Sequence, residues 1–153
     1  MFVFGHLGFG SALALPLKKI RLHKALLVGT LLPDLVDKPL FYSFPELMNG
    51  TRTVAHSLWP ILFLSSIALY KKSRAVGALS FGMLTHLLLD YTGDLIRIDQ
   101  SWSINSRVLF WPFLGGHFPL TPYLHAHEQA ERILRPYFMT TEILGLFLFI
   151  GFL

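Results

Sequence analysis

The sequence predicts an all-α protein, an integral membrane bundle of about four to five short transmembrane helices with a re-entrant or half helix. Only 14% of the 153 residues are charged, against roughly 25% in soluble domains, and 53% are hydrophobic. The apolar residues fall in long runs separated by short basic loops, which is typical of membrane proteins. The length is that of one domain, so we expect residues 1–153 to form a single membrane domain.

Four apolar segments are expected to form the main helices: Phe2–Leu17, Val54–Tyr70, Ala75–Tyr91 and Phe138–Leu153. Each lies at or below the roughly 17–25 residues that a crossing helix needs, so they would borrow flanking residues or pack in a thinned bilayer. The apolar run Ala25–Leu32 is shorter and predicts a half helix. Regular structure is expected to break at Pro39 and again over Pro45–Gly50.

The remaining segments are expected to connect the apolar helices. Thr92–Ser106 and Gly115–Pro136 are polar, and Val108–Leu114 is an aromatic run too short to span. The net charge of +4 sits in short basic runs beside apolar segments, so we expect membrane lipid as partner and no nucleic acid. The chain has no cysteine, which excludes disulfides and thiolate zinc sites.

His86 and Asp90 are the most informative pair in the chain. They stand four residues apart in an apolar segment, so on a helix both side chains project from one face. An imidazole and a carboxylate at this spacing can bind one metal ion, or form a hydrogen bond without a metal. Ionisable groups in so apolar a segment are costly unless they are paired or liganded.

Asp34 and Asp37 form a second acidic pair, at the expected end of the half helix. Carboxylates there meet an unfavourable helix dipole, and a bound cation would remove that penalty. We expect Asp34 to be a metal ligand. Asp37 is either a ligand, a base that orients water, or a solvated acid beside Lys38.

His56 begins the next apolar segment and is expected to be a ligand. Arg52 precedes it by four residues and would share its face if the helix extended back, where it would hold a substrate anion or snorkel to the interface. His6 lies in the first apolar segment. Its assignment as a ligand is supported by its expected place at the same end of the bundle as the other candidate ligands. His125, His127 and Glu128 are interpreted as a solvated loop cluster.

The basic loops and the candidate ligands sort to opposite membrane faces. The positive-inside rule places Lys18–Lys24 and Lys71–Arg74 in the cytoplasm. Alternating helices then bring the histidines and acids to the other side. We therefore expect a protein of the cell's inner membrane with its site at the extracytoplasmic face. Histidine and aspartate without cysteine suit zinc, manganese or iron, with zinc the default, as one ion or as two that share a carboxylate.

These motifs, in this order, resemble those of the membrane-bound metal-dependent hydrolases, also called LexA-binding inner-membrane hydrolases. The resemblance covers roughly residues 1–115. It rests on five short motifs: the N-terminal histidine, Leu32–Pro39, Arg52 with Ala55–Ser57, Thr85–Asp90 and Phe110–Phe113. It implies a metal-dependent hydrolase without naming a substrate.

A more remote resemblance is to zinc-dependent phospholipase C and the fungal single-strand nucleases. Those helical enzymes bind clustered zinc through a series that His6, Asp34, His56, His86 and Asp90 match. The further His-x-x-x-Glu of those enzymes is missing here, so a third metal is not expected.

We therefore expect a membrane-embedded hydrolase that acts on a lipid-like phosphoester through metal-activated water. The ligands would be His6, Asp34, His56, His86 and Asp90, with Asp37 and Arg52 in catalytic roles. One alternative is a non-catalytic membrane protein that uses the cluster as a structural metal site or as an ion or proton pathway. Another is a soluble helical bundle that buries the same segments in its core.

Overall fold

Helices make up every regular element in the part of the chain that the structure describes. The structure is a computed structural model, and it describes residues 3–14, 20–97, 102–119, 131 and 134–152. The elements are α1 (Val3–Ala14), α2 (Ile20–Ser43), α3 (Pro45–Met48), η1 (Val54–His56), α4 (Leu58–Tyr70), α5 (Arg74–Arg97), α6 (Trp102–Leu109) and α8 (Pro136–Phe152). The prediction of an all-α fold is confirmed.

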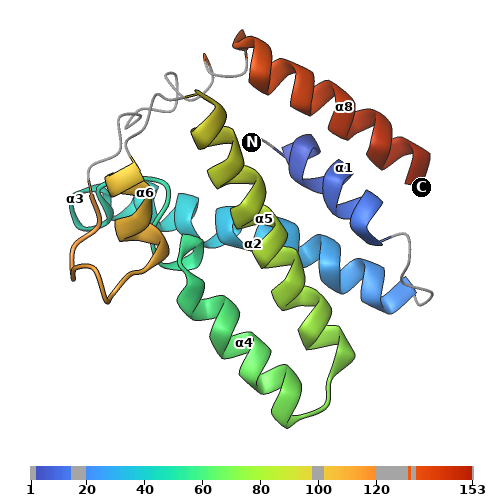
Figure 1. The fold of residues 1–153 in the computed structure, drawn as a ribbon, viewed down its shortest axis with the longest axis horizontal. Coiled ribbons are helices and arrows are strands. Elements are labelled where there is room, and N and C mark those ends of the chain that lie inside the picture. The colour runs from blue at the N-terminus through green and yellow to red at the C-terminus, as the bar shows by residue number, and fades with distance from the viewer. Residues whose placement is uncertain (1–2, 15–19, 98–101, 120–130, 132–133, 153) are drawn as a thin grey trace.

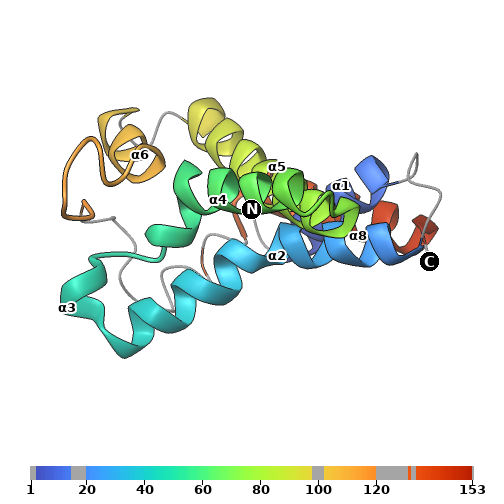
Figure 2. The same ribbon diagram turned by 90° about the horizontal axis from the view of Figure 1, so that it is seen from below.

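The helices are arranged around the crossing of α2 and α5. Figure 1 shows α5 running across α2 near the middle of both helices, and α4 lying beside α5 and leading into it through a short turn. α1 packs between α8 and α2. Seen from below, α3 and α6 lie toward one end of the molecule, and α1 and α8 toward the other (Figure 2). α1, α2, η1 and α5 meet between these ends, and they supply the site.

The crossing of α2 and α5 depends on two glycines that face each other. A Cβ atom added at Gly82 would lie 2.2 Å from the carbonyl oxygen of Leu26 and 2.9 Å from Cα of Gly29. A Cβ atom at Gly29 would lie 2.1 Å from the carbonyl oxygen of Leu79. The two backbones therefore touch directly, and any larger residue would force them apart.

α2 is one long helix, which corrects the expected half helix and the expected break at Pro39. It continues through Pro33 and Pro39, although each proline lacks an N–H group and crowds the carbonyl four residues earlier. The packing of the helix on α5 and η1 outweighs this local cost. As a result, Asp34 and Asp37 lie within the helix, and the argument from the dipole at a helix end does not apply to them.

Three other boundaries differ from the expected ones. The backbone at Arg52 is not helical, because the segment before α4 forms the separate 3₁₀ turn of η1. α5 extends to Arg97, beyond the expected end at Tyr91, and α6 forms within segments expected to be connections. The extra turns of α5 matter for the site, since they carry Asp94.

None of the described helices is both long enough and apolar enough to cross a membrane. The apolar helices α1, α4 and α8 have 12, 13 and 17 residues. The expected set of transmembrane helices is therefore not found among these residues.

Candidate metal centre

Five side chains that the sequence singled out as metal ligands converge where α1, α2, η1 and α5 meet. They form two overlapping groups, His6–His86–Asp90 and Asp34–His56–His86, each with ligand atoms within 4.8 Å of one another. The three histidines are fully buried and Asp90 is 5% exposed. The sequence therefore predicted which residues would come together, although they lie on four different elements.

Hydrogen bonds determine which ring nitrogen of His56 and of His86 carries the proton. Nδ1 of His56 lies 2.8 Å from Oδ2 of Asp37, and Nδ1 of His86 lies 2.6 Å from the carbonyl oxygen of Thr30. A carboxylate and a carbonyl can only accept, so both Nδ1 atoms must donate. In a neutral imidazole, the Nε2 atom then keeps a lone pair.

These two lone pairs face each other. Nε2 of His56 and Nε2 of His86 are 3.2 Å apart. If both imidazoles are neutral and no cation lies between them, the contact is repulsive. A proton is disfavoured at His86, because burial and the neighbouring His6 and His56 lower its pKa to about 3. A metal ion makes the contact favourable, since two ligands of a tetrahedral zinc ion lie about 3.3–3.5 Å apart.

Two carboxylates flank this pair of nitrogens, each belonging to a different one of the two groups of donors. Oδ1 of Asp34 lies 3.7 Å from Nε2 of His56, and Oδ2 of Asp90 lies 3.8 Å from Nε2 of both His56 and His86. Burial raises the pKa of Asp90, but Arg52 and His6 hold it well below its usual value. Two imidazoles and two carboxylates suit zinc.

His6 provides a fifth potential donor. Its ring stacks on the ring of His86 with 3.8 Å between centroids, and its Nε2 atom lies 3.4 Å from Oδ1 of Asp90. Within the described residues, neither ring nitrogen of His6 makes a hydrogen bond, although the side chain is fully buried. A buried polar group without a hydrogen-bond partner destabilises the folded state, and binding a metal ion would give His6 such a partner.

The two groups of donors share His86, and this limits how many metal ions they can bind together. Both include His86, whose Nδ1 already donates to the carbonyl of Thr30. Only Nε2 is therefore available, and one lone pair binds one ion at a time. The geometry favours a single principal ion, with any second ion dependent on His6 and the other oxygen of Asp90.

Asp37 lies behind His56, on the side away from His86. Its carboxylate accepts hydrogen bonds from the backbone N–H groups of Thr53, Ala55 and His56, at 2.7–3.1 Å, as well as from the His56 ring. The side chain is fully buried. Asp37 therefore holds η1 and orients the imidazole, the usual task of a carboxylate behind a metal-binding histidine. It is not the solvated acid of the alternative interpretation.

Arg52 lies against carboxylates at the edge of the site. One of its terminal nitrogens lies 2.9 Å from Oδ2 of Asp90, and the other forms a short ion pair with Asp94. Burial alone would lower the pKa of Arg52, but these two carboxylates raise it. The side chain is 15% exposed. The interfacial snorkelling considered for Arg52 does not describe this arrangement.

Two further side chains lie next to the candidate ligands, and the sequence interpretation missed the first of them. Asp94 is buried and follows Asp90 by four residues, so it extends the row of His86 and Asp90 along one face of α5. That spacing was visible in the sequence. Lys38, 2.7 Å from Asp34, pairs with the other ligand carboxylate. Each candidate ligand carboxylate therefore has a cationic partner.

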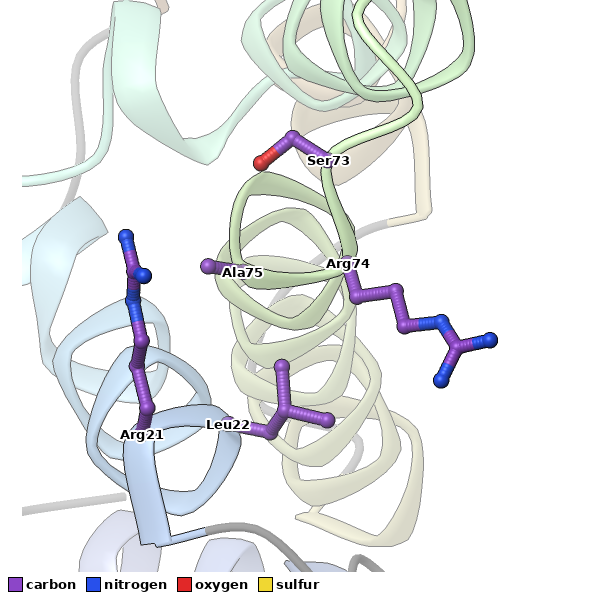
Figure 3. A pocket seen from close by; sticks show the side chains of 5 residues that line it. All are labelled: Arg21, Leu22, Ser73, Arg74 and Ala75. Carbon is purple, nitrogen blue, oxygen red and sulfur yellow. The ribbon is translucent and has the colours of Figure 1, made fainter.

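Other polar groups do not join the centre. His117 is exposed in the segment after α6. His125, His127 and Glu128 lie outside the described residues. A cavity of about 200 Å³ between the start of α2 and the start of α5 is lined by Arg21 and Arg74, but their guanidinium groups point to opposite sides (Figure 3). The two guanidinium groups therefore do not converge on one point within this cavity.

Comparison with family models, curated proteins and solved structures found no match to this chain.

Proposed function

We propose that the protein is a zinc-dependent hydrolase with a buried mononuclear centre. The proposal rests on the contact between the Nε2 atoms of His56 and His86, 3.2 Å apart and flanked by the carboxylates of Asp34 and Asp90. Their ring tautomers are set by Asp37 and Thr30. With a fifth position open beside these four groups, a zinc ion would lower the pKa of a bound water and supply hydroxide near neutral pH.

The side chains around this centre would bind a substrate that carries anionic oxygens. Lys38 and Arg52 stand beside the ligand carboxylates, and their side chains are 32% and 15% exposed. Asp34 is the most open of the four principal ligands, with a side chain 16% exposed, so a substrate would approach from its side. A cation beside each of the two carboxylates favours a phosphoester, such as a lipid phosphoester.

Removing His86 tests the metal centre. We expect the wild-type protein to bind about one zinc ion per chain. His86→Ala should weaken zinc binding by more than about a hundredfold, because even residues that only orient a ligand are worth 10- to 100-fold. His117→Ala, which removes an exposed histidine, should bind zinc like the wild type.

The same variants test hydrolysis, with bis(p-nitrophenyl) phosphate as the probe and elemental analysis as the measure of metal. Hydrolysis should depend on added zinc and be lost in His86→Ala. If the protein retains no metal, and His86→Ala hydrolyses the probe as fast as the wild type, the proposal is wrong.

Burial favours a second candidate function, a structural metal site in a non-catalytic protein. His6, His56 and His86 are fully buried, and Asp90 is nearly so. A structural site fills every ligand position with protein groups. Retention of zinc without hydrolysis of phosphoesters, and with slow exchange against free cobalt, would support this function over catalysis.

The location that agrees with such a substrate is a membrane surface. Large apolar side chains are exposed along α4 and α8, an unusual surface that often marks contact with lipid. They include Trp59, Leu62, Phe63, Leu69, Ile143, Leu144, Phe147 and Ile150. The protein is proposed to rest these faces against the acyl chains of the inner membrane.

Flotation with phosphatidylglycerol-containing vesicles tests this location. The wild-type protein should float with the vesicles at both low and high salt, because apolar contact is not screened by ions. Replacing Phe63 and Phe147 by serine should reduce the floating fraction. Protein that stays at the bottom of the gradient without detergent would contradict membrane binding and leave the metal centre untouched.

A further inference from the structure

The last helix reaches back to the first turn of the chain. Glu142 of α8 accepts two hydrogen bonds at the start of α1: its Oε2 from the backbone N–H of Phe4 at 2.8 Å, and its Oε1 from that of Gly5 at 3.0 Å. The residues are 137 and 138 positions apart in sequence. One carboxylate therefore joins the two ends of the chain.

The groups that Glu142 contacts are ones that a helix cannot satisfy by itself. The first four N–H groups of an α-helix have no partner within the helix, and this end carries a partial positive charge. A carboxylate that accepts from two of these groups makes short, charge-assisted bonds. Because Glu142 belongs to another helix, the bonds also fix how far α1 lies along α8.

Backbone packing supports the same register. A Cβ atom at Gly8 would lie 2.0 Å from the carbonyl oxygen of Gly145, so α1 and α8 touch without side chains between them. α8 also contacts α5, where a Cβ atom at Gly93 would lie 2.9 Å from the hydroxyl of Tyr137. α8 thus links the start of α1 to the helix that carries His86 and Asp90.

His6 directly follows the clamped residues Phe4 and Gly5. Its ring is placed by stacking on His86 and by its approach to Asp90, since within the described residues its nitrogens make no hydrogen bond. A shift of α1 along its axis would therefore move the ring nitrogens of His6 away from the centre. A rotation of α1 would do the same.

We propose that Glu142 is a positioning residue for the metal centre, which sets His6 as a ligand by clamping the first turn of α1. This inference rests on the proposed zinc function. It assigns the C-terminal helix a task in metal binding, although none of the proposed ligands lies on it.

Hydrogen exchange of the backbone amides tests the clamp without metal. In Glu142→Ala, the amides of α1 should exchange about 2- to 30-fold faster than in the wild type, the range expected for a lost helix cap. Glu142→Gln, which keeps one acceptor oxygen, should lie between the two. Glu46→Ala removes an exposed glutamate of α3 and should leave α1 unchanged. Unchanged exchange in Glu142→Ala would overturn the clamp.

A double-mutant cycle with zinc tests whether the clamp acts through His6. Glu142→Ala should weaken zinc binding roughly tenfold in the wild-type background. It should change zinc binding less than about twofold when His6 is already alanine, and Glu142→Gln should restore part of the loss. An equal effect in both backgrounds would overturn this inference alone. A wild-type protein that binds no zinc would overturn both this inference and the proposed function.

Discussion

Replacing Asp37 by alanine is expected to lower the free energy of unfolding by about 4 kcal/mol or more. The variant leaves the backbone N–H groups of Thr53, Ala55 and His56 without their acceptor, together with the Nδ1–H group of the His56 ring. Each buried donor without a partner costs about 1–3 kcal/mol. η1 should therefore detach from α2, and zinc binding should be lost with the orientation of His56.

Urea unfolding followed by circular dichroism measures this effect. Asp37→Asn keeps one acceptor oxygen, and its loss of stability should be smaller than that of Asp37→Ala. Glu46→Ala, an exposed acid on a neighbouring helix, serves as the matched control and should unfold like the wild type. A stable Asp37→Ala protein that still binds zinc would show that the carboxylate does not hold η1.

The second large effect is expected where α2 crosses α5. Gly82→Ala places a methyl carbon 2.2 Å from the carbonyl oxygen of Leu26, a backbone atom that cannot rotate away. The helices must separate, which we expect to cost about 3 kcal/mol or more. The separation should also lengthen the 2.6 Å contact between His86 and the carbonyl of Thr30, one turn further along α5. Zinc binding should weaken with it.

Gly77→Ala is the matched control for this variant. Gly77 lies in the same helix, but its added methyl group would meet only the side chain of Ala68, at an ordinary 3.8 Å. Replacing glycine by alanine within a helix should then raise stability by up to about 1 kcal/mol. Thermal unfolding of the two variants compares them directly. Equal melting temperatures would mean that the crossing tolerates a side chain.

The side chains of the site were predictable because helical spacing fixes direction. His86 and Asp90 share a face of α5 for that reason, and the sorting of polar residues to one end of the apolar segments anticipated that His6 and His56 would join them. The course of α2 was not predictable in the same way. Two prolines indicate a helix end locally, and only packing against α5 and η1 shows that the helix continues.

The residues that support the ligands were the hardest to find in the sequence. A backbone carbonyl, that of Thr30, orients His86, and no residue pattern marks such an acceptor. Glu142 reaches α1 from the far end of the chain, so its task depends on the packing of α8. Asp94 was different, because its spacing of four residues from Asp90 was visible but fell in a segment interpreted as a connection.

The most direct test of the account is the position of zinc in crystals grown with the ion, located by its anomalous scattering. We expect a peak at about 2.0–2.1 Å from Nε2 of both His56 and His86, with oxygens of Asp34 and Asp90 in the same shell. Zinc found only at other residues, with the two Nε2 atoms still in contact and no metal between them, would contradict the account.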